Sequence, residues 1–379
     1  MKKDIRKLMI HINSLGKGGA ERVVSLLVPR FVEDNVEVVV ATEWEDKEEY
    51  ALDGRARRIH AGLSEAQEKA LVWQKQYFRV RNLRRIIKAE KPDILLSFCV
   101  KANYRAIMAS LGMDIPVVIS VRNDPKVDYV GGSKPLMNKM LLNRAAGCVF
   151  QTQEAREFFD AVLQKKSIII CNPINEKYLK AERKPAARKI VFVGRIVEQK
   201  NPMLLVKAFE ELLQKHPDYH LYFYGEGLED DSLEKIRQYL EENLPQRKRA
   251  KENIHFMGLS DTLEKDMADA AMFVLPSDYE GMPNALMEAM ALGLPVISTD
   301  CPCGGSRYWI SPGKTGQLVP VGDVKGLTQA MEWYISHPDK AEVMGIHARQ
   351  RLKEASLDRV YGQWKNYLNH VIIGKNQTR

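Results

Sequence analysis

Short apolar runs alternate along the chain with longer segments whose apolar positions recur every three to four residues. In the first half the runs occupy residues 8–13, 36–42, 94–99, 115–121, 148–152 and 167–171. A helical period is visible between the first two runs, at residues 20–32. Continuous apolar strands separated by helices indicate a parallel sheet covered on both faces.

The alternation stops in the polar stretch CNPINEKYLKAERKPAARK at residues 171–189 and then restarts. Further strands are expected at residues 189–193, 220–224, 254–257, 272–275, 295–298 and 317–319. Three helical patterns close the chain, near 324–336, 340–354 and 357–372. We therefore predict two doubly wound α/β domains, residues 1–172 and 173–355, followed by a final helix.

The composition changes this picture little. A chain of 379 residues is too long for one ordinary core, which agrees with two domains. The apolar run near the amino terminus is interrupted by His11 and reads as a strand, not as a signal peptide. The five cysteines are odd in number, and Cys301 and Cys303 lack the second pair that a zinc site needs. We expect reduced thiols and a cytoplasmic protein.

Charge is distributed unevenly between the two halves. Residues 1–172 hold 29 Lys and Arg against 21 Asp and Glu, whereas residues 173–379 hold 28 of each kind. The net charge of +8 therefore arises in the first half. Such a field suggests an anionic partner there: nucleic acid, an acidic membrane surface or a phosphorylated acceptor.

Residues 71–91 form a basic amphipathic pattern. Apolar side chains recur at helical spacing at Trp73, Tyr77, Val80, Leu83 and Ile87. Cations fill much of the rest, at Lys75, Arg79, Arg81, Arg84, Arg85 and Lys88. Two interpretations stay open: a helix packed on the core with a solvated face, or a helix attracted to anionic lipid head groups.

Candidate chemistry follows strand ends, where open parallel sheets bind their ligands. The loop NSLGKGGAERVV follows the first strand and opens a helix, so Gly16, Gly18 and Gly19 predict a phosphate-type loop or a tight turn. The spacing matches neither G-x-G-x-x-G nor the P-loop. After the strand at 189–193, GRIVEQKNP offers Arg195 and Lys200, and two cations suit a diphosphate.

The stretch SDYEGMPNALMEAM, residues 277–290, places Glu280 in a Gly-containing turn and Glu288 about one turn into a helix that starts near Pro283. Side chains on a helix lean toward its amino end, so Glu288 can reach a ligand at the helix mouth. Glu280 would meet the other end of that ligand. Ordinary surface carboxylates are the alternative.

These motifs resemble the retaining enzymes of glycosyltransferase family 4. The resemblance covers almost the whole chain and is carried by FVGRIVEQKNPMLLVKAFEEL, VLPSDYEGMPNALMEAMALGLPVISTDCPCGG and SLGKGGAERVV. It implies the GT-B fold, with the acceptor on the first domain, a nucleotide-sugar on the second, and a helix at residues 356–379 crossing back to the first. Arg195 and Lys200 would contact the donor diphosphate, Glu280 the transferred sugar and Glu288 the ribose.

The resemblance implies a larger donor site, with the base near Met257. Its expected members are Gly18, Gly19, Gly194, Arg195, Lys200, Met257, Gly258, Leu259, Glu280, Gly281, Met282, Pro283, Asn284, Ala285 and Glu288. The chain departs from many relatives after the strand at 115–121, where VRNDP places Arg122 at or next to a His that contacts the sugar. Catalytic roles are thus expected for Glu280, Arg195, Lys200 and Arg122, and acceptor contacts for Lys101, Asn103, Arg122, Asn123 and Asp124.

The expected reaction transfers a sugar with retention from a nucleotide-sugar, a UDP-sugar being favoured, to a glycan or polyprenyl-linked acceptor of a bacterial envelope polysaccharide. The chain contains no D-x-D, so we expect no metal and no cofactor, with cations stabilising the leaving diphosphate. The enzyme would be cytoplasmic, with peripheral contact to the inner membrane face. The alternatives are a hydrolase or phosphorylase using Glu280 and Glu288, or a non-enzymatic binder of an anionic polymer such as nucleic acid. The second alternative lacks visible aromatic stacking platforms.

Overall fold

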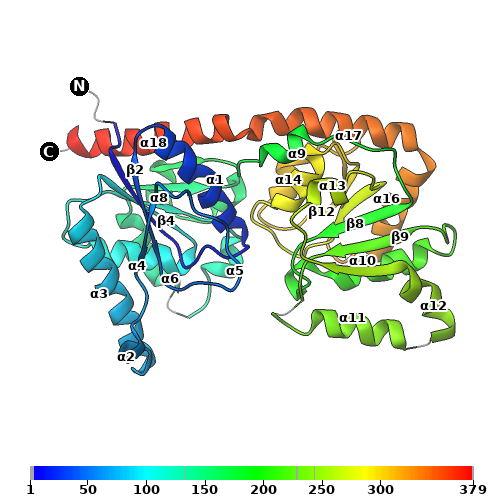
Figure 1. Ribbon diagram of the computed structural model, residues 1–379, viewed down its shortest axis with the longest axis horizontal. Coiled ribbons are helices and arrows are strands. Elements are labelled where there is room, and N and C mark those ends of the chain that lie inside the picture. The colour runs from blue at the N-terminus through cyan, green and yellow to red at the C-terminus, as the bar shows by residue number, and fades with distance from the viewer. Residues whose placement is uncertain (1–3, 133, 228, 243, 378–379) are drawn as a thin grey trace. The chain divides into compact units, whose positions relative to one another are not determined.

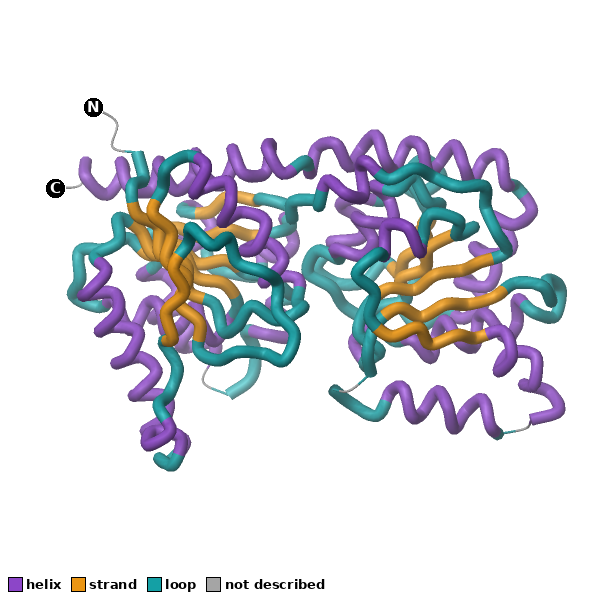
Figure 2. Tube along the Cα trace, viewed as in Figure 1, coloured by secondary structure: helices purple, strands orange, loops and turns teal. Residues whose placement is uncertain are grey.

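The computed structural model describes residues 4–132, 134–227, 229–242 and 244–377. The chain forms two compact units (Figure 1): unit 1 comprises Met1–Pro173 with Leu357–Arg379, and unit 2 comprises Ile174–Ser356. Each unit contains one parallel sheet with helices packed around it (Figure 2). Two parallel α/β sheets confirm the predicted fold class.

The sheet of unit 1 has the strand order β3-β2-β1-β4-β5-β6-β7, with all neighbours parallel. Its strands are β1 (Lys7–His11), β2 (Glu37–Thr42), β3 (Arg57–His60), β4 (Ile94–Phe98), β5 (Val117–Ser120), β6 (Gly147–Phe150) and β7 (Ser167–Ile169). The chain direction across the sheet reverses between β1 and β4. Loops at the carboxyl ends of these two strands therefore diverge and leave room for a ligand.

The helices of unit 1 connect these strands, except α18, which follows unit 2 in the sequence. They are α1 (Gly19–Glu33), α2 (Glu65–Glu68), α3 (Val72–Glu90), α4 (Val100–Ser110), α5 (Pro125–Asp128), α6 (Lys134–Leu141), α7 (Gln153–Glu157), α8 (Ala161–Lys165) and α18 (Leu357–Gln377). A 3₁₀ turn, η1 (Leu142–Arg144), follows α6. Helical crossovers let strands that follow one another in the sequence lie parallel.

Strand β3 was absent from the sequence prediction. It lies at the sheet edge, and its four residues, RRIH, are exposed or half-buried. Arg57 there pairs with Glu37 at 3.0 Å. Charged side chains are typical of edge strands because they discourage pairing with other chains. Because charged residues fill most of its positions, β3 lacks the apolar run by which a buried strand is recognised.

The sheet of unit 2 has the order β10-β9-β8-β11-β12-β13, again parallel, and reverses between β8 and β11. Its strands are β8 (Lys189–Val193), β9 (His220–Tyr224), β10 (Ile254–Gly258), β11 (Met272–Leu275), β12 (Val296–Thr299) and β13 (Gln317–Val319). Each of these was expected, within a residue or so. The second reversal predicts a second ligand-binding region, beyond β8 and β11.

The helices of unit 2 include α14, whose residues are almost all buried. The helices of unit 2 are α9 (Glu176–Lys180), α10 (Pro202–Leu212), α11 (Ser232–Glu241), α12 (Leu244–Asn253), α13 (Leu263–Asp266), α14 (Asn284–Ala291), α15 (Gly305–Trp309), α16 (Val324–Ser336) and α17 (Pro338–Leu352). Two 3₁₀ turns are η2 (Glu198–Lys200) and η3 (Lys353–Ala355). Deep burial of α14 fixes the turn that precedes it.

Helix α18 belongs to unit 1 although it follows unit 2 in the sequence. Trp364 is fully buried against Phe98, with ring centroids 5.7 Å apart. Tyr367 accepts a hydrogen bond from the Cys148 amide at 2.9 Å. Lys365 pairs with Asp34 at 2.6 Å, near the end of α1. An apolar anchor and polar contacts at separate points therefore hold this helix on unit 1.

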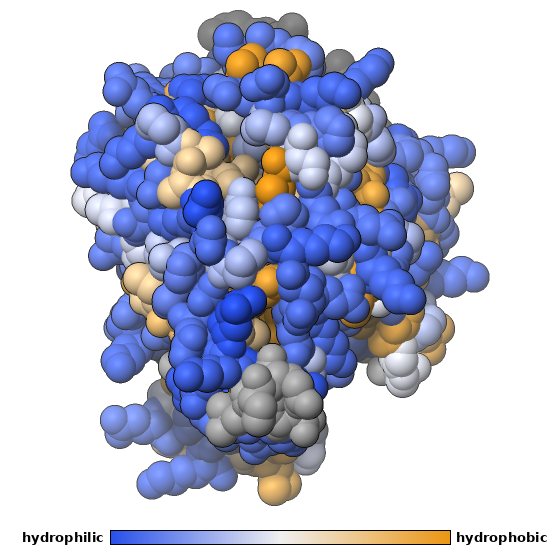
Figure 3. Space-filling model, turned by 90° about the vertical axis from the view of Figure 1, so that its right-hand side faces the viewer, coloured by the Kyte–Doolittle hydropathy of each residue, from blue (hydrophilic) through white to orange (hydrophobic). Residues whose placement is uncertain are grey.

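The surface offers no membrane-spanning element within the described part of the chain, where no helix is both long and apolar enough to cross a bilayer. The face in Figure 3 is predominantly hydrophilic, with apolar residues scattered over it. Scattered apolar residues are normal for a protein surface and need no special explanation.

Candidate functional site

The loops beyond β8 and β9 in unit 2 approach each other through glycines. A Cβ atom on Gly225 would lie 2.0 Å from the carbonyl oxygen of Gly194, and the Gly225 φ of 142° disfavours any other residue. The Gly225 amide donates to the Gly258 carbonyl at 2.8 Å. The carboxyl ends of β8, β9 and β10 thus meet as bare backbone, which a ligand can approach closely.

The turn after β11 is tied to the turn after β8. The Asp278 amide donates to the Gln199 carbonyl at 2.9 Å, and the Gln199 side chain donates to the Tyr279 carbonyl at 3.0 Å. Asn201, which caps α10 through its side-chain oxygen, donates its amide group to Asp278 at 2.7 Å. These contacts join two segments about 80 residues apart and set the position of Lys200 relative to Glu280.

Lys200 and Glu280 form an ion pair. The Ser277 hydroxyl donates to the same Glu280 oxygen at 2.7 Å. The side chains of Lys200 and Glu280 are 15% and 7% exposed, so the pair is largely withdrawn from water. The sequence predicted both residues as donor contacts on different loops, and the structure brings them into direct contact.

Glu288 lies within α14 and is 2% exposed. Pro283 caps this helix without a side-chain hydrogen bond. The turn before the helix is packed tightly, since a Cβ atom on Gly305 would lie 2.0 Å from the Gly281 carbonyl oxygen. A glycine at the start of α15 therefore lets the segment 280–283 take its place beside the sheet.

Arg195 lies apart from the buried ion pair. Its guanidinium pairs with Glu229 at 2.5 Å, and both side chains are more than half exposed. They border a groove of about 480 Å³ whose lining residues are Arg195, Val197, Glu198, Gln199, Glu229, Asp230, Asp278 and Tyr279. Arg195 and Lys200, both predicted to bind the diphosphate, thus form ion pairs with different carboxylates. Glu229 was not among the predicted residues.

The segment after β12 borders the same ion pair. Burial raises the pKa of Cys301 to about 12, and the Glu280 charge adds to this effect. Thr299, at the end of β12, donates its hydroxyl to the Ser277 carbonyl. The thiol of Cys301 therefore stays protonated and neutral, as expected for a structural cysteine.

The predicted base-binding residues lie at the end of β10. Met257 and Leu259 are 50% and 48% exposed on either side of Gly258, whose φ is 70°. Exposed apolar side chains beside a backbone turn suit a flat aromatic ligand. Their contact with a nucleotide base stays a prediction.

In unit 1 the glycine loop follows β1, and Gly18 caps α1. A Cβ atom on Gly18 would lie 2.2 Å from a carboxylate oxygen of Glu21, so this side chain folds back over the loop. Glu49 braces the loop from outside by accepting from the amides of Leu15 at 3.3 Å and Asp46 at 3.0 Å. The hydrogen bond from Arg58, with these backbone contacts, lowers the pKa of Glu49 to about 2 despite partial burial.

The R-N-D-P segment follows β5. Arg122 donates to the side chain of Asn172, and its guanidinium lies 5.6 Å from the centre of the Phe98 ring. Asp124 caps α5 by accepting from the Lys126 amide at 2.9 Å. The Asn123 side chain contacts Asp128 at 3.4 Å. Asp124 thus has a local structural role that accounts for its presence.

The two candidates after β4 differ in exposure. Lys101 is exposed at the start of α4. Asn103 is fully buried and donates to the Ser120 carbonyl at 2.9 Å and to the Tyr129 hydroxyl at 3.0 Å. The structure places Asn103 in the core, where it donates to the end of β5. An acceptor contact of Asn103 stays a prediction.

Helix α3 packs on the core through part of its length and is exposed over the rest. Attraction of residues 71–91 to lipid stays a prediction. Leu83 and Ile87 are buried, whereas Trp73 and Tyr77 are 68% and 60% exposed. The Arg84 side chain donates to the carbonyls of Ala109 and Leu111 at 2.8 and 2.7 Å. The second half of α3 therefore packs on the core, and the first half presents exposed apolar side chains.

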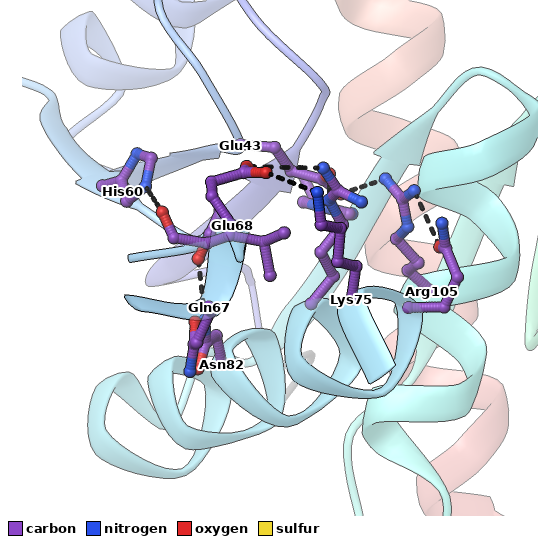
Figure 4. Close-up of polar contacts among 12 residues, drawn as sticks. Glu43, His60, Gln67, Glu68, Lys75, Asn82 and Arg105 are labelled. Atoms are coloured by element: carbon purple, nitrogen blue, oxygen red, sulfur yellow. Dashed lines mark hydrogen bonds and ion pairs between the residues drawn. The ribbon is translucent and has the colours of Figure 1, made fainter. Parts of the chain in front are cut away.

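A buried carboxylate fixes α3 to the sheet. Glu43, at the end of β2, pairs with Arg105 of α4 and, at 3.1 Å, with Arg79 of α3. Hydrogen bonding to His11 and the charge of Arg105 lower its pKa, outweighing its burial, the largest influence. Figure 4 shows Glu43 and Arg105 in this network, with Lys75 beside Glu68.

Sequence reasoning missed Ser277, Glu229, Glu21, Gln151 and Asn172. Four of them follow strand ends directly or in the next loop, and Glu21 lies in the first turn of α1. Their position was available from the strand-end rule, but hydroxyl, amide and carboxylate side chains are common in loops, and their partners lie far along the chain.

Two family models match the chain. Glycosyltransferase Family 4 matches residues 17–178, and Glycosyl transferases group 1 matches residues 187–337. The first match covers most of unit 1, and the second covers most of unit 2.

Similar proteins carry related names. An uncharacterized glycosyltransferase of Methanocaldococcus jannaschii is 28% identical over 268 residues, 64% of each chain. A Campylobacter jejuni enzyme, N-acetylgalactosamine-N,N'-diacetylbacillosaminyl-diphospho-undecaprenol 4-alpha-N-acetylgalactosaminyltransferase, is 27% identical over 92% of this chain and 95% of its own. Anabaena HepE, solved in complex with UDP and glucose, superposes with a TM-score of 0.75 at 16% identity, over 96% of this chain and 99% of its own.

Proposed function

Because this chain belongs to glycosyltransferase family 4 and has the GT-B fold, we propose that it transfers a sugar from a nucleotide-sugar, a UDP-sugar being favoured, to a glycan or polyprenyl-linked acceptor. Family membership favours a transferase over a hydrolase, a phosphorylase or a non-enzymatic binder. The UDP preference is supported by the UDP complex of HepE, and the acceptor class by the name of the C. jejuni relative. A role in bacterial envelope polysaccharide synthesis follows from that acceptor class.

The buried pair of Lys200 and Glu280 is the observation that carries the proposal. A nucleotide-sugar joins a neutral ring rich in hydroxyls to a dianionic diphosphate. An ammonium group suits the phosphate oxygens, and a carboxylate suits the sugar hydroxyls. Two such groups in contact can therefore bind on either side of the bond that the reaction breaks.

Charge on the departing nucleoside diphosphate has to be stabilised in the transition state. Lys200 supplies a cation in a largely dry position, where electrostatic effects exceed those in water. Arg195 supplies a second after it leaves Glu229. These cations would do what a bridging metal does in other transferases, so activity should survive treatment with a chelator.

Retention is proposed to occur by front-face attack, in which the acceptor hydroxyl forms its bond to the anomeric carbon as the bond to phosphate breaks. The hydroxyl proton passes to the departing phosphate oxygen. Glu280 already accepts from Ser277 and Lys200 through one oxygen, which makes it a weak nucleophile. A trapped glycosyl adduct on Glu280 would count against this route, and the anomeric configuration of the product decides retention.

A membrane contact of unit 1 is part of the proposal. We define the α3 tip as Leu71, Val72, Trp73 and Tyr77, which are 60–78% exposed. Exposed cations accompany it at Lys69, Arg81 and Arg85. Aromatic side chains beside cations suit the interface of an anionic bilayer, which would place the enzyme on the cytoplasmic face of the membrane.

The experiment is a panel of UDP- and GDP-sugars incubated with the protein, with release of nucleoside diphosphate as the signal. We expect slow hydrolysis of one donor without acceptor and faster release with a polyprenyl diphosphate-linked sugar. If no donor in the panel is hydrolysed or transferred, the proposed function fails.

A further inference from the structure

Arg122 lies at the carboxyl ends of four neighbouring strands of unit 1. Its Nη2 donates to the side-chain oxygen of Asn172, beyond β7. Its Nη1 makes a weaker contact with the Ser120 hydroxyl at 3.4 Å. The face of Phe98, which ends β4, is 5.6 Å from the guanidinium carbon. All of these neighbours are neutral.

The positive charge of Arg122 therefore has no direct counter-ion. Among the residues that the structure describes, no carboxylate forms an ion pair with it. Burial lowers the pKa of Arg122 to about 10, and the more distant Glu21 only partly opposes this. A guanidinium partly withdrawn from water without an anion is destabilising, and buried charges in proteins are normally paired.

Hydrogen-bonded side chains fix the position of the Arg122 guanidinium. The Gln151 side chain donates to the same Asn172 oxygen at 2.8 Å, so one oxygen accepts from two donors. Gln151 and Asn172 are each 2% exposed, which fixes their positions by packing. Arg122 itself is half-buried and remains partly open to solvent.

Two polar atoms of this group are left without partners. They are Nε of Arg122, a donor, and Oε1 of Gln151, an acceptor. Buried polar atoms without partners are few in native proteins, and they mark places where a ligand, ion or water completes the structure. The unsatisfied donor of Arg122, on an uncompensated guanidinium, suits an oxyanion, and the unsatisfied acceptor of Gln151 suits a hydroxyl.

We propose that Arg122, held in place by Asn172 and Gln151, is the receptor for a phosphoryl group of a substrate. This inference rests on the proposed function, in which a nucleotide-sugar donor and a polyprenyl-linked acceptor both carry diphosphates. A planar guanidinium matches two phosphate oxygens at once, and the bound oxyanion would supply the missing counter-charge. Gln151 Oε1 can accept from a neighbouring hydroxyl of the same substrate.

Isothermal titration of the full chain tests the site with three probes: UDP, farnesyl diphosphate and inorganic pyrophosphate. In Arg122→Gln we expect at least one of the three to bind about tenfold more weakly, because a hydrogen bond to a charged group is lost. Weaker binding of UDP alone assigns the site to the donor, and of farnesyl diphosphate alone to the acceptor. Unchanged affinity for all three probes overturns the proposal.

Asn172→Asp is the second variant. It places a carboxylate of nearly the same shape beside Arg122, so it should raise the melting temperature and weaken the same probe about tenfold. It answers the question even if Arg122→Gln folds poorly. Asn143→Ala is the control, because it removes a hydrogen bond to Asp160 at 2.8 Å away from this group and should leave affinity within about twofold. Asn172→Asp with wild-type affinity for every probe contradicts the inference.

The two proposals fail separately. If the wild type turns over a nucleotide-sugar while Arg122→Gln binds all three probes normally, the phosphoryl site is wrong and the transferase function stands. If no donor reacts but pyrophosphate binding still depends on Arg122, the function is wrong and the site stands. A wild type that binds none of the probes overturns the site.

Discussion

At the scale of single residues, the proposed donor site depends on which charged side chains are paired. Lys200 and Glu280 are withdrawn from water and joined, whereas Arg195 and Glu229 are joined on an exposed rim. Removing one member of a largely buried pair leaves a charge that water cannot reach. The exposed pair is screened by solvent and contributes little to stability.

Lys200→Met should therefore impair both stability and catalysis. We expect a loss of about 3–5 kcal/mol in unfolding free energy, because Glu280 remains buried and unpaired. We expect kcat to fall by about 10²–10³, because the leaving diphosphate loses a charged hydrogen-bond donor. Chemical denaturation and initial-rate kinetics measure the two effects.

The matched control is Arg188→Ala, which breaks the pair of Arg188 and Asp218, whose side chains are 66% and 63% exposed. It should change stability by less than about 1 kcal/mol. Equal effects of the two substitutions would show that burial does not distinguish the pairs.

Glu49 predicts an acid-dependent loss of stability. The hydrogen bond from Arg58 is the main cause that lowers the pKa of Glu49 from 4.5 to about 2. The ionised carboxylate therefore stabilises the fold fully at pH values above the pKa of the unfolded state. This stability should decline as the pH falls from about 4.5 to about 2. Glu49→Gln should lose about 1–2 kcal/mol near neutral pH and show a smaller decline below pH 4.5, as measured by urea unfolding at several pH values. An unchanged pH profile would show that Glu49 does not brace the glycine loop.

At the scale of elements, α3 divides into a packed half and an exposed half. The packed half is held by Leu83, Ile87 and the contact of Arg79 with Glu43. Arg84 is occupied in capping the end of α4, so it is not available to lipid. The proposed membrane attraction should therefore depend on the α3 tip and its exposed cations.

Replacing Trp73 and Tyr77 together by Ser should reduce binding to vesicles containing phosphatidylglycerol by about tenfold or more, because the interfacial aromatic groups are lost. Replacing Arg81 and Arg85 by Glu should weaken binding further at low salt, with about 1 kcal/mol lost for each cation removed. Co-sedimentation with vesicles measures both. The melting temperature should be unchanged, since these side chains are exposed.

The control replaces Val343 and Ile346 of α17 by Ser. Both are 49% exposed and apolar, but they lie in unit 2. Their loss should leave vesicle binding unaltered. Retention of binding in the Trp73 and Tyr77 variant would remove the membrane contact from the proposal.

At the scale of the whole molecule, the chain returns to unit 1 after completing unit 2. Trp364 of α18 is buried against Phe98, and Ile5 donates its amide to Asn369 at 3.0 Å. Both ends of the chain therefore contribute to one unit. Stability of unit 1 should depend on residues that follow unit 2 in the sequence.

Trp364→Ala should destabilise unit 1 by about 3–5 kcal/mol, because it opens a large cavity in the core. Hydrogen exchange should rise in β4 and α1 and stay unchanged in β8–β13. Trp44→Ala, at a position 41% exposed, is the control and should cost much less. An equal increase in hydrogen exchange in both units after Trp364→Ala would show that α18 does not stabilise unit 1 selectively.

The sequence by itself determined the two parallel sheets, their strands and the loops that carry Lys200, Glu280 and the glycines. Apolar runs and turn residues are local features, and strand-end loops are recognised without knowing what they touch. The exposed strand β3 escaped this rule because its charges hide the pattern.

Only the tertiary structure decided which charges are partnered and which are not. The pairs of Lys200 with Glu280 and of Arg195 with Glu229 join residues 80 and 34 positions apart. Arg122 meets Asn172 across 50 residues, and nothing in the local sequence distinguishes it from a solvated arginine. The energy of a charge depends on burial and on neighbours brought together by folding, so it cannot be obtained from spacing along the chain.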